Sequence, residues 1–234
     1  MFQLLMTKKL LLFDIDGTLI RAGGAGSRAL DRVFKEFFGI EKSCQSVRMD
    51  GRTDRAIVRD LINFFKVRPE DPIEKTIDDI LHHYLNNLEN EILDKNLYII
   101  LPGIENILGL LKNRSDIVLG LATGNLRRGA EIKLNRGNLF HFFTCGGFGC
   151  DSEIRSELVG FAIQRGKELA KFDFSQEQIF VIGDTEFDIE AGRKAGAKTV
   201  AVATGAHPID TLAKYKPDFL FSDFSDANSF LKIL

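Results

Sequence analysis

The stretch Leu10-Leu-Leu-Phe-Asp14-Ile-Asp-Gly-Thr-Leu19 decides the fold, because it joins an apolar run directly to two closely spaced carboxylates. Its first four residues lack the polar and apolar alternation of a half-exposed strand, and they are typical of a strand covered on both faces. Three later runs have the same character: Ile117–Leu121, Ile179–Ile182 and Thr199–Val202. Strands covered on both faces predict a parallel sheet that lies between layers of helices.

Helical patterns separate the later apolar runs. Between the second and third runs, apolar or small residues recur at helical spacing, namely Leu158, Val159, Ala162, Ile163, Gly166, Leu169 and Ala170. Alternation of strand and helix predicts an α/β fold with a doubly wound parallel sheet. We expect Cys145 on a core strand, and a last strand at Asp218–Phe221 followed by a C-terminal helix.

The residues between the first and second runs have a different pattern, which is helical throughout. We expect Ser27 to be the N-cap of the first helix. The helical patterns cover Leu30–Phe38, Ile57–Phe65 and Ile73–Ile92, and Ile104–Asn113 is the expected crossover helix of the core.

These patterns predict two domains. Residues 21–97 form a small helical cap, inserted after the first strand into a catalytic core made of residues 1–20 and 98–234. Residues 1–5 precede the first strand, and we expect them to be an extension without function.

Asp14 and Asp16 follow the first strand at the edge where open α/β sheets bind their ligands. Their i, i+2 spacing points both side chains to the same side if the strand continues. Two carboxylates so close together would repel each other, so the pair favours a site for a cation or a shared proton. The alternative is that one of them caps a turn around Gly17.

The other strand ends carry matching groups. Thr123-Gly124-Asn125 offers a hydroxyl, an approachable amide and a following helix N-terminus, which suit an anion, although Thr123 could be an ordinary cap. Asp184 and Asp188 follow the third apolar run and should converge on Asp14. Clustered carboxylates favour Mg²⁺, whereas Zn²⁺ would prefer His or Cys.

In their order and spacing, Asp14-Ile-Asp-Gly-Thr-Leu19, Thr123-Gly-Asn125 and Gly183-Asp-Thr-Glu-Phe-Asp188 resemble three signature motifs of the haloacid dehalogenase-like (HAD) hydrolase superfamily. The insert is similar to the helical cap of its phosphoglycolate phosphatase-like branch. The remaining motif is a Lys or Arg, often Lys-Pro, for which Arg155 is the candidate here. A solvated position for Arg155 in the first helical turn is the alternative.

The resemblance implies an Mg²⁺-dependent phosphatase that hydrolyses a small phosphorylated metabolite through an aspartyl phosphate. In that mechanism Asp14 is the nucleophile. The metal ligands are Asp14, Asp16, Asp184 and Asp188. Asp16 is also the acid and base, and its presence favours phosphoryl chemistry over carbon–halogen cleavage. Arg155 and the motif Thr123, Gly124 and Asn125 hold the phosphoryl oxygens.

Two other functions stay open. A phosphomutase of the beta-phosphoglucomutase kind would use the same Asp14 and Asp16. A nucleotide-binding module without catalysis is suggested by Gly24-Ala-Gly-Ser-Arg-Ala29, which matches a dinucleotide fingerprint. Its glycines start well after the strand instead of forming the strand-to-helix turn, which favours a hinge between core and cap.

Arg52 is the candidate for substrate specificity. It lies in the polar stretch Arg48–Asp54, just before a helix that Thr53 is placed to cap. Its guanidinium is suited to a carboxylate or second phosphate on the leaving group. The alternative is a solvated charge or an ion pair with Asp50.

The composition excludes several classes of protein. With 234 residues, 44% of them apolar, the chain can bury a full core. A formal charge of −2 with interspersed acids and bases favours no nucleic-acid partner. No run approaches the roughly eighteen apolar residues of a membrane span, and the N-terminus lacks a signal cleavage site.

Three cysteines without paired spacing favour a reducing cytoplasm, and no pattern indicates the oligomeric state. The histidines, His82, His83, His141 and His207, have no evident carboxylate partner, and we assign them no role.

Overall fold

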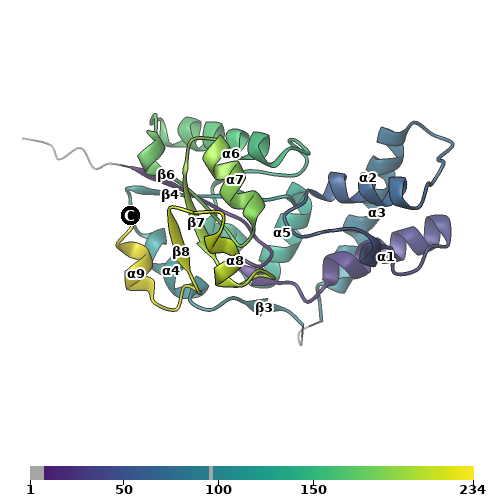
Figure 1. Ribbon diagram of the computed structural model, residues 1–234, viewed down its shortest axis with the longest axis horizontal. Coiled ribbons are helices and arrows are strands. Elements are labelled where there is room, and N and C mark those ends of the chain that lie inside the picture. The colour runs from purple at the N-terminus through teal and green to yellow at the C-terminus, as the bar shows by residue number, and fades with distance from the viewer. Residues whose placement is uncertain (1–7, 95–96) are drawn as a thin grey trace, which may run out of the picture.

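The computed structural model describes residues 8–94 and 97–234. Within them lies a six-stranded sheet with the order β5-β4-β1-β6-β7-β8, and every neighbouring pair of strands is parallel. The strands are β1 (Lys9–Phe13), β4 (Ile117–Ala122), β5 (Cys145–Gly147), β6 (Ile179–Gly183), β7 (Lys198–Val202) and β8 (Phe219–Phe221). The predicted doubly wound α/β fold is therefore confirmed, with β1 at its centre (Figure 1).

Helices cover both faces of this sheet, as buried strands require. Leu11 and Phe13 of β1 pack on one face against α4 (Ile104–Lys112), α5 (Arg127–Arg136) and α9 (Ala227–Leu231). Leu10 and Leu12 pack on the other face against α6 (Arg155–Ala170) and α7 (Glu186–Lys194). Successive residues of one strand thus serve two cores, which explains the continuous apolar run in the sequence.

The cap is a cluster of helices at one end of the molecule (Figure 1). It contains α1 (Ala25–Phe38), α2 (Asp54–Phe64) and α3 (Ile73–Glu91), whose buried apolar residues form one hydrophobic cluster. Ile132 of α5 belongs to the same cluster, so the cap packs on a helix of the core. The exact division at residues 21–97 stays a prediction.

The start of α1 corrects the sequence analysis. We expected Ser27 to be the N-cap, but the cap position is Gly24, with φ of 77°, and Ser27 lies inside the first turn. The positive φ favours glycine, and no side chain caps this helix end. Thr53 does cap α2 as expected, since its hydroxyl accepts a hydrogen bond from the Ala56 amide.

Short elements complete the fold. The strands β2 (Ile20–Arg21) and β3 (Ile99–Ile100) form an antiparallel pair that joins the segments leading into and out of the cap. The remaining elements are α8 (Ile209–Ala213) and the 3₁₀ turns η1 (Ser43–Ser46), η2 (Phe140–Phe142) and η3 (Gln176–Gln178). No helix of the described ranges is long and apolar enough to cross a membrane. The expected extension, residues 1–5, lies outside the described residues.

The cap core should depend on Leu61, whose side chain is fully buried in α2. We expect Leu61→Ala to lower the free energy of unfolding by about 2–5 kcal/mol, because it removes buried methyl groups and leaves a cavity. Phe64→Ala, on the same helix but 58% exposed, should cost less than about 1 kcal/mol. Urea denaturation of both variants measures the difference, and equal losses would contradict this packing.

Candidate active site

Asp14 lies directly after the central strand β1 and is 6% exposed. Its amide donates a hydrogen bond to the Ile182 carbonyl oxygen (2.9 Å), which extends the pairing of β1 with β6. Burial raises the pKa of the Asp14 carboxyl to about 6, although the Arg155 guanidinium acts against this shift. The Asp14 carboxylate therefore lies at the edge of the sheet, at the end of the central strand, with little access to water.

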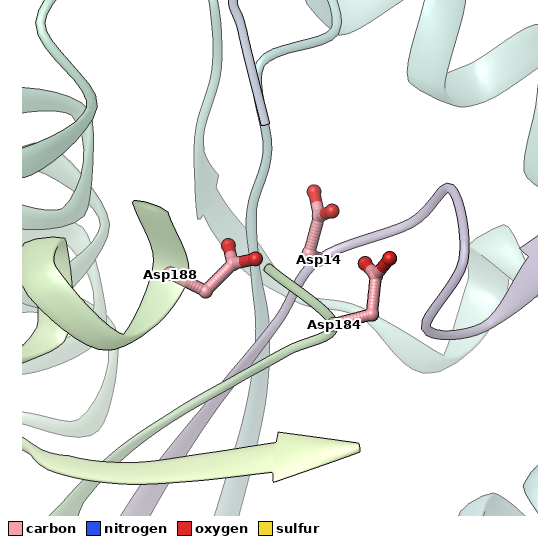
Figure 2. A group of neighbouring side chains, drawn as sticks. All are labelled: Asp14, Asp184 and Asp188. Atoms are coloured by element: carbon pink, nitrogen blue, oxygen red, sulfur yellow. The ribbon is translucent and has the colours of Figure 1, made fainter. Parts of the chain in front are cut away.

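Asp184 and Asp188 join Asp14 in one cluster. Asp184 follows β6 and Asp188 lies in the first turn of α7, and Figure 2 shows the three carboxyl groups gathered where β1 and β6 end. One oxygen from each of the three lies within 4.8 Å of the others. Burial, together with the charges of Asp188 and Asp14, raises the pKa of Asp184 well above its usual value. A divalent cation held by hard oxygens fits this excess of buried negative charge.

Arg155 is the cation that faces the cluster. It is the first residue of α6, and its Nη2 lies 3.0 Å from Asp14 Oδ1 and 2.5 Å from Asp188 Oδ1. The solvated position considered for Arg155 is therefore wrong, since its side chain is only 9% exposed. Its Nη1 also donates to the Gly51 carbonyl oxygen of the cap (3.3 Å).

Asp16 points away from the three carboxylates, toward Asn125 and Lys133. Its Oδ2 accepts hydrogen bonds from Asn125 Nδ2 (2.9 Å) and Lys133 Nζ (2.6 Å). Asn125 also donates to the Thr123 hydroxyl (2.9 Å), so the predicted anion-binding motif is tied to Asp16. The Asp16 carboxylate is not in the cluster, and its role as a metal ligand stays a prediction.

Lys133 was missed by the sequence analysis. It lies on α5 and is 6% exposed, with its ammonium 2.6 Å from Asn125 Oδ1 as well as beside Asp16. Burial alone would lower its pKa, but the Asp16 and Asp54 carboxylates reverse the shift, so that the pKa of Lys133 is raised. The available signal was a lysine flanked by Ile132 and Leu134 on a helix that otherwise buries its apolar side.

The cap touches the anion-binding motif directly. The Asp54 amide donates to the Gly124 carbonyl oxygen (2.9 Å), and Asp54 Oδ2 accepts from the Leu126 amide (2.7 Å). A Cβ on Gly124 would lie 2.2 Å from the Arg52 carbonyl oxygen, so only glycine permits this approach. Asp54, also missed, is half-buried, and desolvation of its carboxyl raises its pKa to about 6.

Arg52 pairs with Asp60, and its Nη2 lies 2.5 Å from Asp60 Oδ2. The alternative pairing with Asp50 is therefore wrong, because Asp50 pairs with Arg48 (2.7 Å). Arg52 lines the cavity described below, and its contact with a leaving group stays a prediction.

His207 also corrects the sequence analysis, which found no carboxylate partner for it. Its Nε2 lies 3.2 Å from Asp50 Oδ2 of the cap and 3.4 Å from Glu186 Oε2 of the core. Arg48 completes this group, since it pairs with Glu186 (2.8 Å) and lies over the Phe187 ring. These contacts join the cap to the core beside the active site.

A cavity of about 610 Å³ lies between the cap and the core. Its core side contains the residues described above, among them Asp14, Asp16, Thr123, Gly124, Asn125, Lys133, Arg155 and Asp184. Its volume is in the range of sites that bind small molecules. The motifs predicted from the sequence therefore share one cavity. Asp188 is not part of the lining, but it accepts hydrogen bonds from the lining residues Arg155 and Thr185.

The fold and these carboxylates define a hydrolase of the HAD type. The family model of the haloacid dehalogenase-like hydrolases matches residues 11–202, so the chain belongs to this family.

Curated relatives resemble the chain over nearly its whole length. A phosphoglycolate phosphatase of Aquifex aeolicus is 28% identical over 224 residues, which cover 93% of this chain and 94% of the relative. A protein provisionally named pyrophosphatase PpaX, from Clostridium perfringens, is 27% identical over 90% of this chain and 91% of its own. A Bacteroides vulgatus structure, provisionally assigned as a beta-phosphoglucomutase, has a TM-score of 0.68 at 22% identity and covers 97% of this chain and 89% of that one. This last likeness concerns the fold alone.

The carboxylate cluster should bind Mg²⁺. Saturating Mg²⁺ should raise the Tm by about 5 °C or more, because it neutralises buried charges in the native state only. In Asp184→Asn most of this rise should disappear. Asp173→Asn, whose side chain is 88% exposed, is the matched control and should keep it. Differential scanning fluorimetry with and without chelator measures the shift, and an unchanged rise in Asp184→Asn would exclude this site.

Proposed function

We propose that this chain is a phosphatase that hydrolyses a small phosphate monoester through a phosphorylated Asp14. The observation that carries the proposal is the pairing of the buried Asp14 carboxylate with the Arg155 guanidinium (3.0 Å) in the wall of the cavity between cap and core. The phosphatase names of the full-length relatives support it.

In the proposed reaction, an Asp14 oxygen attacks phosphorus in line and the bond from phosphorus to the ester oxygen breaks. Arg155 and the Thr123–Asn125 motif bind the phosphoryl oxygens and offset their charge. Asp14 and Asp184 would hold Mg²⁺, with Asp188 beside them, and bound Mg²⁺ supplies further positive charge at the phosphoryl group. The carboxylate cluster fits this ion.

Asp16 is the proposed acid and base. It donates a proton to the leaving alkoxide, and then accepts one from the water that hydrolyses the aspartyl phosphate. Hydrogen bonds from Asn125 and Lys133 fix the orientation of its carboxyl group. We propose Lys133 as a positioning residue for this step.

A phosphomutase would use the same Asp14 and Asp16 but would return the phosphoryl group to the substrate. Steady release of inorganic phosphate without a bisphosphate activator separates the two activities.

The cysteines Cys44, Cys145 and Cys150 are free thiols, which supports a cytoplasmic location.

Asp14→Asn should abolish turnover and leave the fold intact. The amide has the shape of the carboxylate but cannot act as the anionic nucleophile. We expect a loss of at least about 10³-fold in kcat for p-nitrophenyl phosphate, with an unchanged far-UV circular dichroism spectrum. Phosphatase activity near the wild-type level would rule out the covalent mechanism.

Lys133→Met should slow the hydrolysis of esters with poor leaving groups most. An alkoxide needs the proton from a well-placed Asp16, whereas p-nitrophenolate leaves without it. We expect kcat/KM to fall by about tenfold or more for an alkyl phosphate and by less than about threefold for p-nitrophenyl phosphate. Equal losses on both esters would give Lys133 a purely structural role.

A further inference from the structure

The cavity extends from the catalytic carboxylates deep into the cap. Its cap side is lined mainly by apolar side chains from α1, α2, α3 and the loop before α2, namely Leu30, Met49, Ile57, Val58, Leu81 and Tyr84. The phosphoryl group binds at the core side in the proposed mechanism, so this apolar side must receive the leaving group.

The cations around the cavity are already engaged. Lys133 lies beside Asp16 and Asp54, and Arg52 pairs with Asp60. Arg155 is held by Asp14 and Asp188 and serves the phosphoryl group. Within the described part of the chain, the remaining cation of the lining is Arg21, an exposed residue whose guanidinium donates to the Thr204 carbonyl oxygen (2.7 Å).

Within the described residues, the one lining cation without a carboxylate partner is therefore Arg21, and its charge is exposed to water instead of facing the apolar side chains. An anionic leaving group would also lie near Asp54, a half-buried acid in the cavity wall. Moving a charge out of water into such surroundings is costly unless a partner of opposite charge compensates it. The wall thus disfavours a carboxylate or a second phosphate.

The cap side offers neutral hydrogen-bonding groups instead. Tyr84 is 4% exposed, and within the described ranges no hydrogen-bond partner is found for its hydroxyl. The Ser27 hydroxyl has only the Met49 sulfur as an acceptor (3.5 Å). Because buried hydroxyls usually have partners, the Tyr84 hydroxyl, with the half-buried Ser27 hydroxyl as a second group, fits a ligand with a neutral polar atom.

We propose that the substrate is the phosphate ester of an uncharged alcohol with an apolar body. This body fills the cap side of the cavity, the part lined by α1, α2, α3 and the loop before α2, which we call the chamber. This inference rests on the proposed phosphatase function. It separates the chain from relatives whose names specify pyrophosphate or phosphoglycolate, since both of those compounds have anionic leaving groups.

A matched pair of esters tests the charge. Benzyl phosphate and 4-carboxybenzyl phosphate have leaving groups of similar reactivity, and only the second carries a remote carboxylate. We expect kcat/KM to be about tenfold or more higher for benzyl phosphate, and higher than for phosphoglycolate, pyrophosphate and glucose 6-phosphate. Equal or faster hydrolysis of the carboxylate ester would overturn the proposal, and so would a preference for glucose 6-phosphate.

A charge placed in the chamber should change this preference. Met49 is half-buried in a loop, so Met49→Arg can add a cation without disturbing a helix. It should reduce the preference for benzyl phosphate by about threefold or more. Phe64→Arg adds the same charge on the exposed side of α2 and should leave the ratio unchanged. An equal change in both variants, or none in Met49→Arg, would contradict the assignment of the chamber.

The outcome also distinguishes this inference from the proposed function. Hydrolysis of every ester with a preference for the anionic ones would overturn the inference and keep the phosphatase. Absence of turnover on all of these esters with Mg²⁺ present, including p-nitrophenyl phosphate, would overturn both.

Discussion

The electrostatic problem at the end of β1 is the constraint on which the rest of the structure depends. Asp14, Asp184 and Asp188 are each buried, and their oxygens lie close enough to repel. Arg155 compensates part of this charge by contacting two of them. The remaining negative charge fits the proposed cation, because the parallel strands bring these acids to one edge of the sheet. Carboxylates buried this close together are unfavourable for the fold unless a cation or a proton compensates their charge.

The cap is part of the same arrangement. Its loop reaches the anion-binding motif through Asp54, and the Gly51 carbonyl oxygen accepts a hydrogen bond from Arg155. Displacement of the cap would therefore remove hydrogen-bond partners from the residues that are proposed to bind the phosphoryl group. Contacts of this kind couple closure of the cavity to assembly of the site, since both require the loop in one position. A further polar contact joins cap and core, in which Glu186 pairs with Arg48 and with His207.

The sequence predicted the core well because its information is local. Apolar runs mark the strands, and strand ends meet at one edge, so the convergence of Asp14 and Asp184 follows from pattern alone. Lys133 and Asp54 could not be found in this way, since their places depend on how α5 and the cap dock. The same is true of His207, whose partner Asp50 is 157 residues away in the chain. Ser27 failed as a cap because a glycine with positive φ begins α1 earlier.

Specificity is the least readable property for the same reason. The three helices of the cap show only amphipathic patterns in the sequence, and such a pattern cannot separate a residue that packs in a core from one that lines a chamber. Leu81 and Tyr84 belong to the hydrophobic cluster of the cap and also line the cavity. One set of side chains therefore stabilises the cap and, in the proposed function, also selects the leaving group. Because the catalytic acids lie on the sheet and the selecting surface on the helices, a change of substrate needs no change in the chemistry.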